Sequence, residues 1–240
     1  MFKSRLEFIA QRIWPGALFA LGVTFLTPAL FGSTCRVGTL TSYESGVNFG
    51  CTLGPDGGYT MDFESFTSSG VDLLSADEIV VTPSSTATSL TFEFSAANGY
   101  EFAGDPGFTN TYIFQYDLDP PRPKLSGASI NTGPGDPPNL SGLFCGDGII
   151  SGSTCEDGTP LSIGPMTASG VSQTSAIASF PTPVTDMDNQ LTLVLDPCES
   201  IENFGATAYL ATPEPSSLLW LTPGLLAFVW LRKKRLANGQ

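Results

Sequence analysis

Leu90-Thr91-Phe92-Glu93-Phe94 alternates apolar and polar residues with a period of two, which is the pattern of a β-strand that buries one of its faces. Tyr59 to Glu64 repeats this alternation, and Thr111 to Leu118 places an apolar residue at every second position. Three further segments have the composition of strands: Ile79 to Val81, Leu191 to Leu195 and Ala206 to Leu210. Because no long apolar pattern of period 3.6 lies between these segments, the sequence predicts an all-β domain.

Turn-forming residues separate the predicted strands, for example at Gly54-Pro55-Asp56-Gly57-Gly58 and at Ala97-Asn98-Gly99. Short strands broken by frequent turns favour a jelly-roll-like β-sandwich. We expect the Pro- and Gly-rich stretch from Asp119 to Pro138 to form a long loop between the two halves of the sandwich. The Ser/Thr/Gly run from Thr167 to Thr185 is interpreted as a loop, a weak strand or both. Glu199 to Asn203 is expected to form a single helical turn at most.

The charge distribution excludes two classes of function. Histidine is absent, so catalytic triads, general bases and metal ligands that depend on histidine are ruled out. Between Arg36 and Thr212 the sequence holds three cations against 21 acids, a net charge of −18, whereas the whole chain carries −13. Nucleic acid is therefore excluded as a partner, because phosphate binding requires a basic surface.

The first 32 residues have the layout of a secretory signal peptide. Lys3, Arg5 and Arg12 form a positive region, the stretch 13–31 is uncharged, and cleavage is expected just after Gly32. An uncleaved membrane helix is one alternative, which the Pro and Gly residues of the stretch disfavour. Lipidation of Cys35 is another, although the residues before it match the lipoprotein pattern poorly.

The C-terminal segment combines three features in a fixed order. Pro213-Glu214-Pro215 is followed by an uncharged stretch over residues 216–231 and then by Arg232-Lys233-Lys234-Arg235. The uncharged stretch is short for a transmembrane helix and contains Pro223, so we expect a transient anchor. By the positive-inside rule, the four cations place the tail in the cytoplasm and the preceding domain outside.

This three-part order resembles the PEP-CTERM sorting signal of exported bacterial proteins, which is also labelled an ice-binding protein C-terminal motif. The resemblance covers residues 212–236. It implies export, retention in the inner membrane by the tail, cleavage by an exosortase, and release to the cell surface or the extracellular matrix of an exopolysaccharide producer. It also implies a recognition motif of Pro213, Glu214 and Pro215 and a retention signal of Arg232, Lys233, Lys234 and Arg235.

Five cysteines in an exported chain favour disulfide bonds. By sequence proximity the economical pairs are Cys35 with Cys51 and Cys145 with Cys155, which leaves Cys198 unpaired. Spacing does not fix the connectivity, so other pairings stay open. A zinc site is rejected, because the chain has neither a Cys-x-x-Cys pair nor a histidine.

The segment from Cys145 to Gly158 resembles one copy of the CGDG…CDDG disulfide repeats of bacterial surface proteins. The candidate oxygen ligands for Ca²⁺ in this segment and in a later acidic one are Asp147, Glu156, Asp157, Asp186 and Asp188. Neither group has the spacing of an EF-hand loop, so solvated turns are favoured and neither a metal site nor a cofactor is predicted.

No catalytic residue is predicted. The chain has no G-x-S-x-G motif, Cys198 has no histidine to activate it, and paired acids occur by chance among so many carboxylates. The aromatic residues Tyr100, Phe102 and Phe108 suit either a sugar-binding surface or a core, and their spacing favours the core.

The sequence thus predicts a signal peptide (1–32), an acidic β-sandwich (33–211) and a sorting signal (212–236) with a transmembrane helix over 216–231. We expect a non-enzymatic surface or matrix protein that associates with exopolysaccharide. Its expected partners are an exosortase and, before cleavage, the membrane. The alternatives are a secreted carbohydrate-active enzyme that uses paired carboxylates and a calcium-dependent adhesin.

Overall fold

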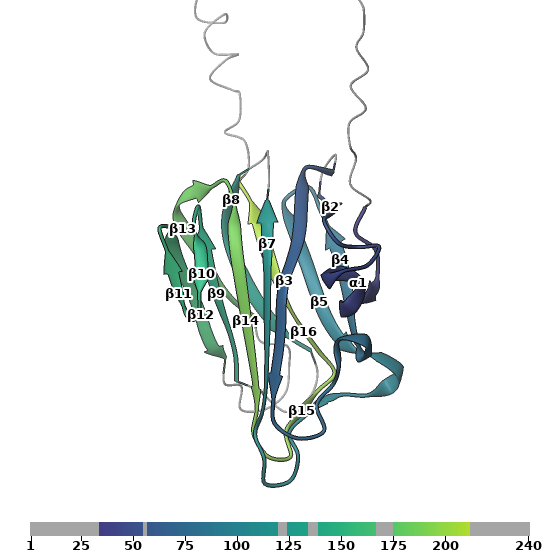
Figure 1. The fold of residues 1–240 in the computed structure, drawn as a ribbon. Helices are drawn as coiled ribbons and strands as arrows, with labels where there is room; N and C mark the ends of the chain where they lie inside the picture. The colour runs from purple at the N-terminus through teal and green to yellow at the C-terminus, as the bar shows by residue number, and fades with distance from the viewer. Residues whose placement is uncertain (1–33, 55–56, 120–123, 134–138, 167–174, 212–240) are drawn as a thin grey trace, which may run out of the picture. The chain divides into compact units, whose positions relative to one another are not determined.

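The computed structural model describes residues 34–54, 57–119, 124–133, 139–166 and 175–211 (Figure 1). The predicted signal peptide, the sorting motif and the predicted transmembrane helix lie outside these residues, so they stay predictions. Within the described ranges, no helix is long and apolar enough to cross a membrane.

Two antiparallel sheets of six strands each are stacked face to face and form a β-sandwich, as the sequence predicts (Figure 1). Sheet I has the strand order β12 (Thr159–Met166), β9 (Asn139–Gly146), β14 (Met187–Leu195), β7 (Asn110–Asp119), β3 (Tyr59–Ser69) and β2 (Cys51–Leu53). Sheet II has the order β1 (Gly38–Thr39), β4 (Ile79–Ser85), β5 (Ser89–Ala96), β16 (Asn203–Leu210), β8 (Leu125–Thr132) and β13 (Ser175–Val184).

Shorter elements complete the described fold. The hairpin of β10 (Ile149–Ser151) and β11 (Thr154–Glu156) lies beside β14, and β6 (Phe102–Ala103) pairs with β15 (Ser200–Ile201). Among the described residues, helical elements include α1 (Leu40–Glu44) and the 3-10 turns Ala76–Glu78 and Ala97–Gly99.

The period-two alternation places aromatic side chains between the sheets. Phe94 of β5 packs on Phe114 of β7 and on Phe204 of β16, with ring centroids 4.7 and 5.4 Å apart. A bulge in β3 between Phe63 and Ser65 shifts its alternation, which lets Phe66 pack against Phe114 at 5.1 Å. The sequence prediction of a core built from alternating strands is confirmed. The bulge explains why the apolar alternation is interrupted once along β3.

Both predicted disulfide bonds are present. Cys35 bonds to Cys51 with an S–S distance of 2.08 Å, and Cys145 bonds to Cys155 at 1.97 Å. Cys198 is free and exposed. The first bridge fixes the chain to β2 where the described domain begins, and the second closes the loop that contains the β10–β11 hairpin.

One sequence prediction of irregular structure was wrong. The expected loop from Asp119 to Pro138 contains β8, an interior strand of sheet II that buries Leu125, Ala128 and Ile130. Because its residues are small, β8 shows no clear alternation of apolar and polar side chains in the sequence. The same small residues let β13 pack closely against it. A Cβ atom on Gly127 would lie 2.4 Å from the carbonyl O of Ala178 on β13.

For Glu199 to Asn203 the sequence allows a single helical turn at most, and the structure has no helix there. Ser200 and Ile201 instead form β15, and β16 begins at Asn203. Ile201 is fully buried, so tertiary packing decides the conformation of this short polar segment. In the run from Thr167 to Thr185, residues 175–184 form β13, which is the strand alternative, while 167–174 lie outside the described residues.

Candidate functional site

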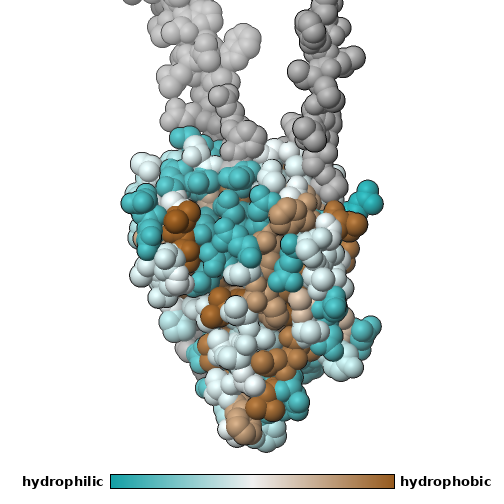
Figure 2. Space-filling view, viewed as in Figure 1, coloured by the Kyte–Doolittle hydropathy of each residue, from teal (hydrophilic) through white to brown (hydrophobic). Residues whose placement is uncertain are grey.

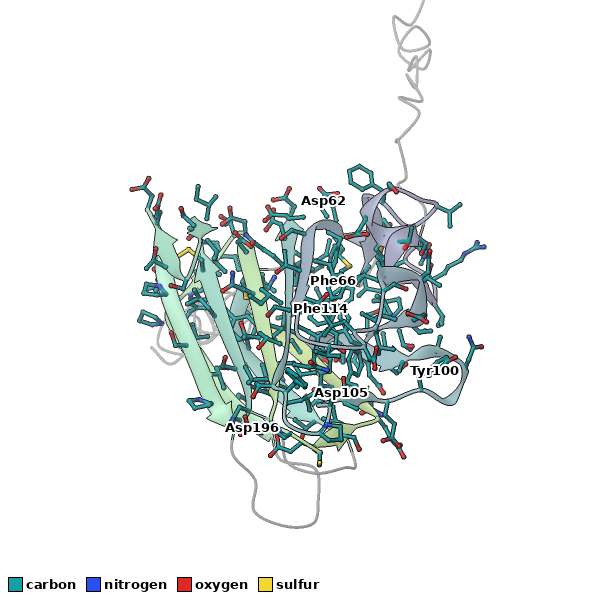
Figure 3. The ribbon with its side chains drawn as sticks, turned by 60° about the horizontal axis from the view of Figure 1, so that its bottom comes forward. Asp62, Phe66, Tyr100, Asp105, Phe114 and Asp196 are labelled. Carbon is teal, nitrogen blue, oxygen red and sulfur yellow. A yellow bond between two sulfur atoms is a disulfide. The ribbon has the colours of Figure 1, made fainter. Side chains whose placement is uncertain are left out.

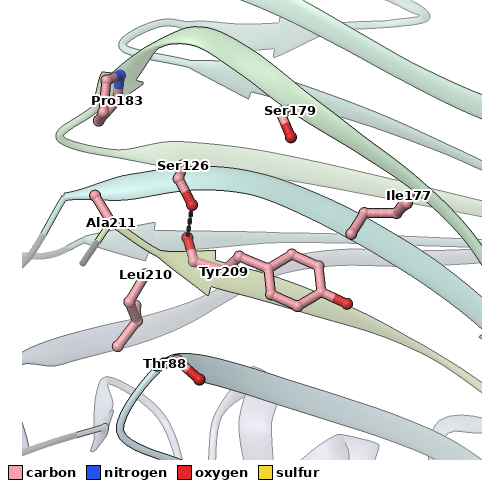
Figure 4. A pocket seen from close by; sticks show the side chains of 8 residues that line it. All are labelled: Thr88, Ser126, Ile177, Ser179, Pro183, Tyr209, Leu210 and Ala211. Atoms are coloured by element: carbon pink, nitrogen blue, oxygen red, sulfur yellow. Dashed lines mark hydrogen bonds between the residues drawn. The ribbon is translucent and has the colours of Figure 1, made fainter.

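A groove on the outer face of sheet II is the larger of two described surface hollows. Because Ala208 and Leu210 of β16 point into the core, Tyr209 between them points outward. The groove has a volume of about 490 Å³. Its lining residues come from β5, β8, β13, β16 and the segments next to them: Thr88, Ser126, Ile177, Ser179, Pro183, Tyr209, Leu210 and Ala211 (Figure 4).

Two hydrogen bonds hold Tyr209 in place, and its neighbour on β8 is a glycine. Its hydroxyl lies 3.1 Å from Ser129 Oγ, and Ser126 Oγ donates to the carbonyl O of Tyr209 at 3.2 Å. On β8 the residue paired with Tyr209 is Gly127, so no side chain stands between the tyrosine and Ser179 of β13. Figure 4 shows the ring lying along the strands, with its hydroxyl at the end far from Ala211.

Among the described residues that line this groove, apolar surface is combined with hydroxyl groups and no side chain is charged. Ile177 is 66 % exposed, although it stands on a strand, and it lies near the ring of Tyr209. Beyond the groove, Thr91 and Thr207 continue the hydroxyl-bearing surface with their Oγ atoms 2.9 Å apart. An aromatic ring beside hydroxyl groups is suited to a ligand with an apolar face and a hydroxyl-bearing edge.

The outer face of sheet I carries a different feature, a row of three aspartates that we name the carboxylate row. Asp62 of β3 pairs with Asp117 of β7, which in turn pairs with Asp188 of β14. Directly opposed residues on one face have Cβ atoms about 4.5–5.5 Å apart, and like charges at that separation repel. Figure 2 shows that hydrophilic residues gather over the upper part of this face.

Burial and repulsion together perturb the carboxylate row. Burial raises the pKa of Asp117 to about 7, and the charges of Asp119, Asp188 and Asp186 add to the rise. The pKa of Asp188 is raised by burial, although hydrogen bonds from Ile150 and Gln115 oppose the rise. Near pH 7, part of the negative charge of the row is therefore neutralised by a proton on Asp117.

Asp188 is the most buried member, with 3 % of its surface exposed. Its Oδ2 accepts hydrogen bonds from the backbone N–H of Ile150 at 2.6 Å and from Gln115 Nε2 at 3.4 Å. Gln115 Nε2 also donates to the carbonyl O of Ile150 at 3.3 Å. The hairpin thus covers Asp188, whose Oδ1 is buried and has no hydrogen-bond partner among the described residues.

The candidate oxygen ligands for Ca²⁺ are only partly brought together. Asp147 accepts hydrogen bonds from Thr185 N and Oγ, both at 2.6 Å, and interacts with Asp186. Glu156 and Asp157 are exposed on and after β11. Across the described ranges, no group of three or more cysteine, aspartate or glutamate side chains is arranged to hold a metal ion.

The three aromatic candidates differ in how far the structure buries them. Phe102 is fully buried, as the core interpretation requires, and its ring packs on Tyr112 and Phe204. Tyr100 and Phe108 are 57 % and 55 % exposed, so the core interpretation is wrong for them. Neither lines a described groove. The aromatic residue that lines the groove is the half-buried Tyr209, which the alternation within the predicted strand from Ala206 to Leu210 marks as outward-facing.

No family model and no curated protein matches this chain. Among solved structures, the chain is similar to TmCBM61 in complex with β-1,4-galactotriose, at 11% identity over 63% of this chain and 90% of that one, with a TM-score of 0.33. It is also similar to the family 11 carbohydrate-binding module from Clostridium thermocellum, at 10% identity over 76% and 99% of the two chains, with a TM-score of 0.26.

Another similar structure is the enzymatically active domain of tailspike protein 4 from bacteriophage CBA120. The identity is 9% over 71% of this chain and 21% of that one, with a TM-score of 0.29. Similarities at these TM-scores are too low to carry a fold or a function over to this chain.

Proposed function

We propose that the β-sandwich is the non-catalytic, sugar-binding domain of an exported surface or matrix protein, and that the Tyr209 groove binds an uncharged polysaccharide. The observation that carries this proposal is a groove whose described lining residues are all uncharged, on a domain whose net charge is −18. The face of a sugar ring packs against an aromatic ring, while sugar hydroxyls exchange hydrogen bonds with Ser126, Ser179 and Thr88. Acidic polymers are repelled by the rest of the domain.

Export is supported by two independent features of the chain. The N-terminal 32 residues have the signal-peptide layout, and residues 212–236 resemble the PEP-CTERM sorting signal. Disulfide bonds also suit a protein that matures in an oxidising compartment. We therefore propose that an exosortase cleaves near Pro213-Glu214-Pro215 and releases the domain to the cell surface or the matrix.

Sugar binding is tested by affinity electrophoresis and calorimetry of the mature protein with a neutral galactan, a neutral β-glucan and polygalacturonate. Tyr209→Ala is expected to weaken binding to a neutral polymer at least about tenfold, or about 1.4 kcal/mol, the size of a typical aromatic hot spot. Tyr100→Ala removes an exposed tyrosine elsewhere and is the matched control.

Equal losses in the two variants, or none in Tyr209→Ala, would refute the assignment of the groove. A preference for polygalacturonate would contradict the charge argument. Release of shortened sugars would instead favour the carbohydrate-active enzyme.

Sorting is tested separately, by mass spectrometry of the product in the producing cell. Glu214→Gln, or deletion of residues 232–235, is expected to leave the C-terminal segment attached or to change the destination of the protein. Glu202→Gln, at an exposed position of the domain, is the control. Processing that is identical in all three variants would contradict the sorting assignment.

A further inference from the structure

In the part of the chain that the structure describes, no cationic side chain offsets the carboxylate row. The charges that act on Asp117 come from Asp119, Asp188 and Asp186, and all of them are negative. Glu64 adds another acid, with a pKa raised by burial and by Asp188. Like charges directly opposed across strands are destabilising. This repulsion is relieved by a bound proton or by a bound cation.

The buried carboxylate of Asp188 also lacks a hydrogen-bond partner for one of its oxygens among the described residues. Only 3 % of the surface of this residue is exposed. An unpaired oxygen of a buried carboxylate is costly, because its hydration is lost and not replaced. Asp188 is paired with Asp117 in the register of sheet I. The free oxygen therefore belongs to the carboxylate at the β14 end of the row, beside Asp117.

We propose that the carboxylate row binds a divalent cation of the Ca²⁺ type, with Asp188 and Asp117 as its inner ligands. Ca²⁺ takes six to eight oxygen ligands in flexible geometry, and carboxylates are its common protein ligands. As placed, no three acids within the described ranges are arranged to hold an ion, so the ion draws in the more exposed Asp62 and Asp119 by side-chain rotation.

Binding of this cation has a structural consequence for the hairpin. Oδ2 of Asp188 already accepts the Ile150 N–H, while Gln115 joins the same carboxylate to the Ile150 carbonyl. A cation that holds Asp188 in its ionised form strengthens these bonds, because charge-assisted hydrogen bonds are stronger than neutral ones. We therefore expect the cation to fasten the β10–β11 hairpin to sheet I. The affinity expected for an extracellular module is weak, about 10⁻⁴–10⁻³ M.

The first test compares melting temperatures of the full exported protein in EDTA and in CaCl₂ at pH 8. At a tenfold excess of Ca²⁺ over Kd, the expected rise in Tm is about 3–6 °C. At pH 5.5 the rise should shrink, since protons compete with the cation for the same oxygens. Hydrogen exchange at the Ile150 amide should slow when Ca²⁺ is added at pH 8.

Amino-acid substitutions test whether the Ca²⁺-dependent rise in Tm comes from the carboxylate row. Asp117→Asn and Asp188→Asn are expected to abolish the Ca²⁺-dependent rise, while Asp105→Asn should retain it. Asp105 lies at the opposite end of the sandwich from Asp62 (Figure 3). Equilibrium dialysis with Ca²⁺ then measures binding directly, so the result does not depend on how each variant melts.

Two results overturn the proposal. If Tm at pH 8 is the same in EDTA and in Ca²⁺ and dialysis shows no retained ion, protons alone neutralise the row. If both Asp117→Asn and Asp188→Asn keep the full Ca²⁺ effect, the ion binds elsewhere on the chain. Sugar binding at Tyr209 is measured independently, so either proposal can fail alone.

Discussion

Replacing Asp117 with asparagine should stabilise this protein at pH 8, which is the opposite of what most substitutions of partly buried residues do. The reason is the pKa of Asp117, which burial and then the neighbouring acids raise from 3.8 to about 7. The folded state holds a proton that the unfolded state has already lost. Stability is therefore fully present below pH 3.8 and falls as the pH rises through about 7.

The size of the effect follows from that shift. A shift of about three pKa units corresponds to about 4 kcal/mol if it is counted in full. Asp117 is only half-buried, and screening by solvent reduces the value to about 1–2 kcal/mol. For a domain of this length, that amounts to a rise in Tm of about 3–6 °C at pH 8. At pH 4.5 the wild-type side chain is protonated when folded, so the gain should largely disappear.

Urea unfolding in EDTA at a series of pH values from 4.5 to 8.5 measures this prediction without interference from cations. Asp117→Asn should flatten the pH dependence between pH 5 and 8, whereas Asp105→Asn should reproduce the wild-type curve. The reasoning is refuted if Asp117→Asn is no more stable than wild type at pH 8. It is also refuted if wild-type stability rises from pH 5 to 8, since a raised acid pKa gives the opposite slope.

The remaining predictions concern the scaffold. Replacing Cys35 and Cys51 with serine opens a closed loop of sequence separation 16 and should lower the free energy of unfolding by about 3 kcal/mol, as measured in urea. Phe204→Ala removes a ring that contacts Phe94, Phe102 and Phe114 and should cost about 3–5 kcal/mol. The control Phe108→Ala, at a residue 55 % exposed, should change stability by about 0.5 kcal/mol or less.

The sequence predicts those strands whose apolar residues are large. Leu90 to Phe94 and Thr111 to Leu118 became β5 and β7, because alternating aromatic and aliphatic side chains leave one satisfactory orientation in a sandwich. β8 escaped prediction because Gly127, Ala128 and Ser129 carry little hydropathy signal. Its place in sheet II depends on contacts with β16 and β13, which lie more than forty residues away in the chain.

The two candidate sites differ in how far the sequence reveals them. Tyr209 can be assigned to the surface from its neighbours in the predicted strand, but the groove requires the glycine on β8 and the position of β13. The carboxylate row is invisible in the sequence, because Asp62, Asp117 and Asp188 are far apart in the chain. Only the register of β3, β7 and β14 places them in one line. Register is a tertiary property that residue patterns alone do not fix.

The position of the groove bears on the proposed release of the protein. Ala211 lines the groove, and its backbone N–H donates to the carbonyl O of Lys124 at 2.7 Å. Pro213 follows two residues later, a span of at most about 7 Å. Cleavage near Pro213-Glu214-Pro215 would therefore leave β16 and its sheet hydrogen bonds intact, together with the described residues that line the groove. If the groove is the sugar site proposed above, sugar binding should be equal before and after processing.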